Sequence, residues 1–170
     1  MNKLLKSAID NLAIVNVNLR DSVSKMGDGF NSLNVIETPK KLQSFRRISK
    51  IEVIEMVKEG EEDVSKIFYS FHYDIGSRLV APEKHDHTDD EDSSIVCIEA
   101  TFEAIYRAKV RLSKDELEAF AAKNVGYNVW PYWREYLQAT CSRMGVPAIK
   151  VPFYQFRDVS DLPPEEQTEA

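Results

Sequence analysis

Histidine and acidic residues that could bind a metal ion gather in one short segment. Residues 85–92 read HDHTDDED, and imidazole and carboxylate groups are the ligands that divalent cations take in proteins. No rigid element is expected to hold this segment in a fixed geometry, and no partner that would orient its histidines is evident. A solvated acidic loop over residues 81–94, without a metal, is therefore the prediction. A metal-dependent binder or enzyme that uses this loop together with His72 is the alternative.

The other candidate bases and nucleophiles stand without partners in the sequence. His72 is a lone histidine on an expected strand, with no nucleophile beside it. Cys141 falls on the apolar face of an expected helix, where a thiol is usually inert, and Cys97 falls on the more accessible face of a strand with no activating cation nearby. The motifs GxGxxG, GxxxxGKS, GxSxG and HExxH are absent. The sequence therefore lacks the specific routes to an enzyme that these motifs would indicate.

Aromatic residues concentrate toward the C-terminus. Five of them fall between Tyr127 and Tyr136, and Phe153, Tyr154 and Phe156 follow. Aromatic stripes at helical spacing are mostly core packing, but these rings exceed one helix face, and the excess suits an oligomer interface or an adaptable apolar groove. The residues expected to form this aromatic surface are Trp130, Tyr132, Trp133, Tyr136, Phe153 and Tyr154.

Hydrophobic periodicity predicts the elements that carry these side chains. Helical spacing indicates a short amphipathic helix within residues 1–12. Alternation with period two predicts strands over residues 15–20, 67–75 and 96–112, and richness in Ile, Val and Met predicts a strand over 48–58. The glycine-rich residues 25–29 open an irregular crossover toward Pro39. The long alternation over 96–112 is typical of an antiparallel strand with one buried face.

Two helices are expected after the last strand. Ser113 and Glu116 fit a capping box that starts the first helix, and residues 124–126 are expected to end it. The second helix is expected from Pro131 to Met144, with Gly145 as its C-terminal cap. More than half of its circumference is apolar, so one sheet cannot cover it.

Length and charge exclude several classes of protein. A chain of 170 residues is the size of one domain, which we place at residues 1–156, with an acidic, disordered tail at 157–170. The net charge of −6 disfavours nucleic acid as the main partner. No uncharged apolar run of transmembrane length occurs, so no membrane insertion is expected.

The aromatic block resembles the hallmark of the SecB chaperone family. Residues 126–136 read GYNVWPYWREY and residues 142–147 read SRMGVP. The family places a hydrophobic-aromatic-Pro-Tyr-x-Arg-Glu block at the start of its long helix and ends that helix with an Arg-x-Gly-x-Pro type stop. Trp133, where export members carry a small residue, resembles the divergent branch that protects antitoxins. The family's helix after the proline-containing loop has no counterpart here, because residues 157–170 lack an apolar stripe.

The resemblance implies an α+β fold, with a four-stranded antiparallel sheet, a long crossover after the first strand and C-terminal helices packed on the sheet. It also implies a cytoplasmic, ATP-independent holdase that assembles as a homotetramer, a dimer of dimers. The implied protein is not an enzyme and has no catalytic residue and no cofactor. Its implied clients are unfolded pre-secretory proteins or an antitoxin, with the SecA motor as a further partner of the export branch. The aromatic surface of six residues named above is then the predicted client-binding surface. A purely structural oligomeric scaffold is the third possibility.

Charges are segregated along the strand expected at 96–112. Glu99 and Glu103 form an acidic patch, and Arg107, Lys109 and Arg111 form a basic one farther along. Charges of this kind chiefly tune association rate and salt dependence. Glu99 and Glu103 are therefore the predicted partner-docking residues, and the alternative is that these charges only keep a sheet face soluble.

Overall fold

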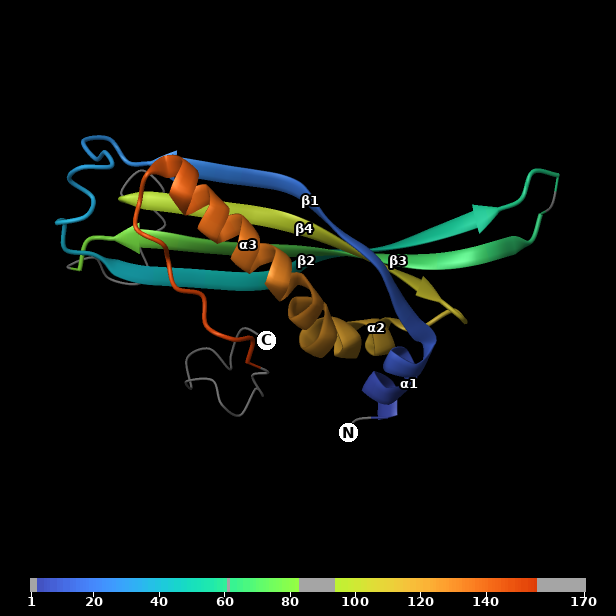
Figure 1. Cartoon of the computed structure of the whole chain (residues 1–170). Helices are drawn as coiled ribbons and strands as arrows, with labels where there is room; N and C mark the ends of the chain where they lie inside the picture. Colours follow the sequence, from blue (N-terminus) through green and yellow to red (C-terminus); the bar gives the residue numbers. More distant parts are fainter. Residues whose placement is uncertain (1–2, 61, 83–93, 156–170) are drawn as a thin grey trace.

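The computed structural model describes residues 3–60, 62–82 and 94–155. Within them the elements are α1 (Lys3–Asn11), β1 (Leu12–Met26), β2 (Lys41–Val57), β3 (Val64–Val80), β4 (Val96–Ala108), α2 (Lys114–Phe120), the π-helical turn η2 (Ala121–Val125) and α3 (Gly126–Met144). The strands form one antiparallel sheet in the order β1-β4-β3-β2 (Figure 1). The predicted α+β fold is confirmed. The expected acidic loop and tail lie outside the described residues, except for the loop's ends.

The two outer strands follow each other in the chain. β1 pairs only with β4, β2 pairs only with β3, and the segment 27–40 crosses from one edge of the sheet to the other. This segment consists of turns and irregular backbone (Figure 1). The predicted long crossover after the first strand is therefore confirmed, and it leaves β1 and β2 as exposed sheet edges.

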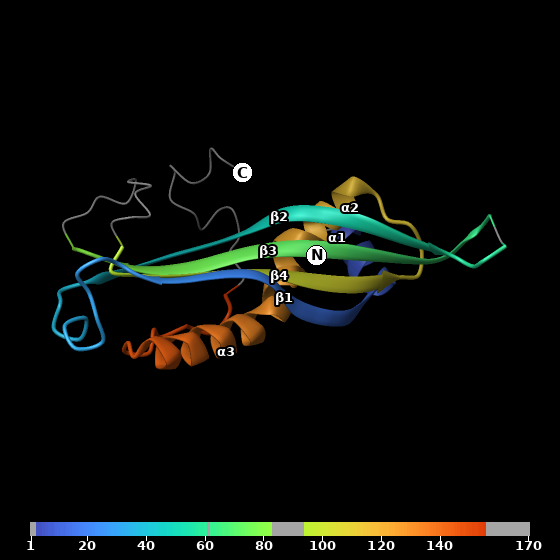
Figure 2. The same cartoon turned by 90° about the horizontal axis from the view of Figure 1, so that it is seen from above.

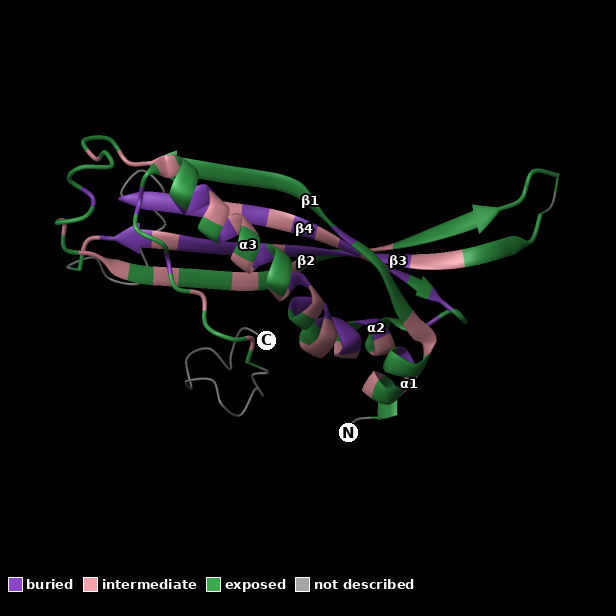
Figure 3. Ribbon diagram, in the orientation of Figure 1, coloured by how far each residue is buried: buried purple, intermediate pink, exposed green. Residues whose placement is uncertain are grey.

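The helices cover one face of the sheet. α3 runs along the strands on that face (Figure 2), where Phe102 contacts Tyr136, and Tyr106 contacts Phe120 edge-on at 5.0 Å between ring centroids. The alternating residues of β4 from Val96 to Ala108 are buried there, so the central strands carry most of the burial (Figure 3). The alternation predicted for this strand is confirmed, although the strand ends at Ala108 rather than at residue 112.

The helical segment differs from the prediction. We expected a stop at residues 124–126 and a new helix at Pro131, but α2 passes through η2 into α3 without a break, and Pro131 lies inside α3. Gly126 is helical, and a Cβ on it would lie 2.6 Å from the Tyr154 hydroxyl. This glycine therefore permits close packing and does not end a helix. The capping box of Ser113 and Glu116 and the left-handed Gly145 cap are confirmed.

The first two strands are longer than predicted because bulges interrupt their alternation. The pairing register shifts at Val15 and Arg20 in β1 and at Ser49 in β2. A bulge adds one residue and reverses the inward and outward positions that follow it. The sequence patterns therefore marked only part of each strand. None of the helices in the described residues combines the length and the apolar character needed to cross a bilayer.

Candidate functional site

A groove of about 860 Å³ lies between the edge strand β2, the helices and the chain segment after α3. We call it the aromatic groove. Its walls are Leu42, Ser44, Phe45, Arg46, Arg47 and Ile48 of β2, Tyr73, Ile75, Gly76 and Ser77 of β3, Ala121 and Ala122 of η2, Trp130 and Trp133 of α3, and residues 150–155. Its volume is typical of a binding pocket, with mostly apolar walls and a few polar groups.

The chain after α3 forms one rim of the aromatic groove. The Trp130 indole donates a hydrogen bond from Nε1 to the Pro152 carbonyl at 2.9 Å. The Trp130 and Tyr154 rings meet edge to face at 5.4 Å, and the Arg46 guanidinium lies 4.7 Å from the centroid of the Tyr154 ring. Arg46 also donates to the carbonyl of Gln155 at 3.1 Å. α3, the edge strand β2 and residues 150–155 therefore hold one another in place.

The groove presents aromatic rings with little fixed negative charge. Burial raises the pKa of Tyr73 to about 12, against the smaller opposing effect of Arg46, so its hydroxyl stays neutral at physiological pH. Arg46 supplies a cation and hydrogen-bond donors at the rim. An extended polypeptide offers apolar side chains and backbone carbonyls, and this lining can pack against the first and donate to the second.

The predicted client-binding residues divide into an exposed and a buried set. Phe153 is 83% exposed and Tyr132 is 48% exposed, while Trp130 and Tyr154 are half-buried at the groove. Trp133 is only 2% exposed and belongs to the core, as its place on the face of α3 toward the sheet requires.

Tyr136 lies between these two sets. Its ring stacks on Trp133 with centroids 6.2 Å apart, and its hydroxyl is 3.5 Å from Ser24 Oγ of β1. Burial by itself would raise the pKa of Tyr136, but hydrogen bonds with Ser22, Ser24 and Thr140 lower it overall. Tyr136 therefore fixes α3 against the β1 edge, on the side of the helix away from β2.

Sequence reasoning missed the wall that β2 contributes. Leu42 and Arg46 line the groove, yet the sequence did not predict a strand over residues 41–47. Its residues Lys41-Leu42-Gln43-Ser44-Phe45-Arg46 do not alternate between apolar and polar. Only the position of Leu42 and Arg46 on the same side of a strand would have pointed to them.

The predicted docking carboxylates lie on the opposite face of the sheet. Glu103 accepts a hydrogen bond from Ser70 at 2.7 Å and pairs with Arg20 at 3.3 Å. Glu99 is half-buried, and the Cys97 thiol lies 3.5 Å from its carboxylate. Glu103 therefore already has partners within the chain. The two carboxylates differ in their surroundings and do not form one exposed acidic surface.

Both cysteines are buried, and neither forms a disulfide within the described residues. The expectation that Cys97 lies on an accessible face is wrong, because it is only 6% exposed between neighbouring strands. Burial raises the pKa of the Cys141 thiol, which disfavours the reactive thiolate. The inert role expected for Cys141 agrees with this environment.

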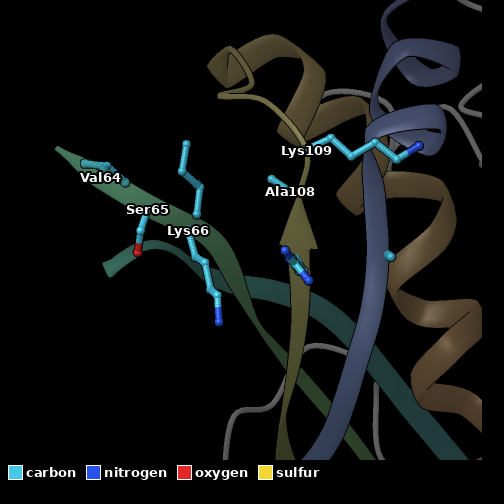
Figure 4. A pocket seen from close by; sticks show the side chains of 8 residues that line it. Val64, Ser65, Lys66, Ala108 and Lys109 are labelled. Atoms are coloured by element: carbon cyan, nitrogen blue, oxygen red, sulfur yellow. The ribbon is translucent and has the colours of Figure 1, made fainter. Parts of the chain in front are cut away.

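A second cavity, of about 420 Å³, opens where β3 begins and β4 ends. Lys66, Arg107 and Lys109 are among its lining residues, but the side chains of Lys66 and Lys109 extend in different directions (Figure 4). Lys109 donates from Nζ to the Asp10 carbonyl at 2.7 Å. Among the described residues, no set of polar groups converges in this cavity, so the aromatic groove is the better candidate site.

Comparisons with known proteins place the fold. No family model matches the sequence, and no curated protein matches it. Among solved structures, a SecB-like chaperone of Mycobacterium tuberculosis, in complex with a ChAD peptide from the HigA1 antitoxin, matches with a TM-score of 0.61. The match has 13% sequence identity and covers 91% of this chain and 98% of the other. The chain therefore has the fold of the SecB-like chaperones.

Proposed function

We propose that this protein is an ATP-independent molecular chaperone, a holdase that keeps unfolded polypeptides soluble by binding them in the aromatic groove. The observation that carries the proposal is the groove itself, where exposed and half-buried rings of α3 and residues 150–155 stand beside the edge strand β2. The structural similarity to a SecB-like chaperone solved with a bound peptide supports a chaperone function.

The apolar lining of the aromatic groove explains how the protein would bind clients that share no sequence motif. Burial of apolar surface contributes about 25 cal/mol per Å² before ordering costs are subtracted. A long unfolded client can therefore gain affinity from many weak contacts, and no single side chain of the client is required. The exposed Phe153 is the lining residue most available for such contacts.

The proposed client is an antitoxin of a toxin–antitoxin system, in the cytoplasm. Trp133 supports this branch through the resemblance of the block around it, and the similar mycobacterial structure holds an antitoxin peptide. Export clients handed to SecA are the alternative. If a dedicated partner docks on the acidic residues, Glu99 is the one to test, because Glu103 already pairs with Arg20 and Ser70.

The proposed assembly is a homotetramer, a dimer of dimers, of about 78 kDa from four 19.5-kDa chains. Two exposed apolar regions support it. The edge strand β1 exposes Ile14, Val15, Leu19 and Val23, and α3 exposes Tyr127 and Tyr132. An unpaired edge with apolar side chains is prone to pair with another chain. Light scattering that gives a monomer at micromolar concentration would contradict this assembly.

Aggregation of a chemically denatured test protein, followed by light scattering, tests the function. The parent protein should suppress aggregation at stoichiometric amounts, and Phe153→Ser should weaken the suppression. Leu33→Ser is the matched control, because Leu33 is 82% exposed, as Phe153 is 83%, but does not line the groove. A parent that suppresses nothing would refute the holdase, and equal loss in both variants would refute the groove.

A further inference from the structure

Three potential metal ligands meet on the sheet face opposite α3. Glu52 of β2, His72 of β3 and Glu103 of β4 come from three adjacent strands, and one ligand atom of each lies within 4.8 Å of the others. The strand register brings them together, since His72 is the direct cross-strand partner of Glu103 and Glu52 pairs with Ser70, the residue two positions before His72. No two of these three residues are neighbours in the sequence, so spacing along the chain could not predict the cluster.

The imidazole of His72 is buried without a hydrogen bond at Nε2. The residue is 8% exposed, and Nε2 has no hydrogen-bond partner among the described residues. A buried polar nitrogen without a hydrogen-bond partner costs free energy, so the position of Nε2 calls for an explanation. The two nearest oxygens are Oε2 of Glu52 at 3.0 Å and Oε1 of Glu103 at 3.7 Å.

These positions suit a shared cation. The Glu52 oxygen lies within hydrogen-bonding distance of Nε2 but does not meet the angle that an Nε2–H bond requires. In a tetrahedral zinc site with bonds of about 2.0–2.1 Å, the ligand atoms are about 3.3 Å apart. Each ligand atom points its lone pair at the metal and not at the other ligand atoms, so no hydrogen-bond angle is expected between them. The separations of 3.0 and 3.7 Å bracket that value.

The surrounding charges permit a dication. Two carboxylates and a neutral imidazole together neutralise a charge of +2. Lys50 lies 2.6 Å from Glu52 and Arg20 lies 3.3 Å from Glu103, and both cations have side chains more than half exposed. Such surface pairs contribute little to stability, so both can turn toward water when a metal binds. The Ser70 hydroxyl donates to Glu103 and orients it, as a supporting residue of a metal site does.

We infer that Glu52, His72 and Glu103 form a binding site for a divalent transition metal of the zinc class. An imidazole ligand favours zinc over calcium or magnesium, which prefer oxygen ligands. With three protein ligands, a fourth position is left for water or another donor. The ion would tie β2, β3 and β4 together on the face opposite the helices. The inference does not depend on the proposed chaperone function.

Zinc titration of the full chain tests the site. Residues 85–92 contain two further histidines, so every protein in the experiment carries His85→Ala and His87→Ala. Zinc affinity is measured by competition with a chromophoric chelator, and cobalt(II) absorption reports the coordination. We expect one zinc ion per chain and a cobalt(II) absorption spectrum typical of four-coordinate, tetrahedral metal. Glu52→Gln, Glu103→Gln and His72→Asn should each lower the zinc affinity at least about 10-fold, because loss of even a supporting residue beside a metal ligand costs about 10–100-fold.

Glu55→Gln provides the matched control. Glu55 lies on the same strand as Glu52 and its side chain is 32% exposed against 37%, but it pairs with Arg111 outside the cluster. Glu52→Gln changes a partly exposed side chain, so it tests the site even if His72→Asn fails to fold. Equal zinc affinity for Glu52→Gln and Glu55→Gln would overturn the inference. A parent protein that binds no zinc would also overturn it.

Discussion

Replacing Trp133 by alanine should separate a core role from a surface role among the aromatic residues of α3. The indole is 2% exposed and stacks on Tyr136. An aromatic side chain buries roughly 150–250 Å², which at about 25 cal/mol per Å² corresponds to about 4–6 kcal/mol. This is an upper value because the unfolded chain is partly compact. Large-to-small substitutions of tryptophan cost about 3–5 kcal/mol, and we expect Trp133→Ala to fall in that range.

Equilibrium unfolding in urea, followed by far-UV circular dichroism, measures this loss. Tyr132→Ala is the control because Tyr132 is the preceding residue of the same helix and is 48% exposed. If Tyr132 contributes to association, the free energy of unfolding lost in Tyr132→Ala should become smaller on dilution, because stabilisation by assembly depends on protein concentration. The loss in Trp133→Ala should not depend on concentration.

Two results would refute this reasoning. A loss below about 1 kcal/mol in Trp133→Ala would mean that the indole is not packed as core. Loss of client protection in a Trp133→Phe variant that unfolds like the parent would return this residue to the client-binding surface.

Three further substitutions test local features. Tyr69→Phe should cost about 1–3 kcal/mol in urea unfolding, because the buried Leu112 amide loses the Tyr69 hydroxyl at 2.8 Å; no change would contradict the buried bond. Gly145→Ala should lower the free energy of unfolding by about 1–2 kcal/mol, because Gly145 has a left-handed φ of 67°, which strains a residue with a Cβ. An unchanged midpoint of urea unfolding would refute the left-handed cap. Hydrogen bonds, first from Ser7 and then from Ser113, lower the pKa of Glu116. Its carboxylate therefore stabilises the fold above its unfolded pKa of about 4.3, and this contribution disappears as the pH falls through the lower folded value. Melting temperatures from pH 7 to 3 should fall more steeply for the parent than for Glu116→Gln, and parallel curves would argue against this linkage.

The fold was predictable where one period persisted. β4 has a regular alternation, and its apolar side packs against the helices as expected. The strand β2 was only half predicted, because the bulge at Ser49 shifts the register and places Ile48 and Ile51 on the same side of the sheet. The π-helical turn was missed because Gly126 looks like a helix stop in sequence, whereas its small size serves the contact with Tyr154.

The candidate site was predictable only in its aromatic part. Trp130, Phe153 and Tyr154 meet at the groove as the concentration of aromatic residues suggested. Arg46 could not be found from sequence, because its approach to Trp130 depends on α3 lying beside an edge strand more than 80 residues earlier. The same limit applied to His72, whose partners Glu52 and Glu103 come from neighbouring strands.

Site-specific photo-crosslinking tests the central claim, that unfolded clients bind in the aromatic groove. A photoreactive phenylalanine analogue is placed at Phe153 or at Leu33, two positions of nearly equal exposure. Each protein is mixed with a chemically denatured client and irradiated. We predict strong crosslinks to the client from position 153, weak ones from position 33, and competition at 153 by an unlabelled unfolded client. Equal crosslinking from both positions, or none from 153 while aggregation is still suppressed, would contradict it.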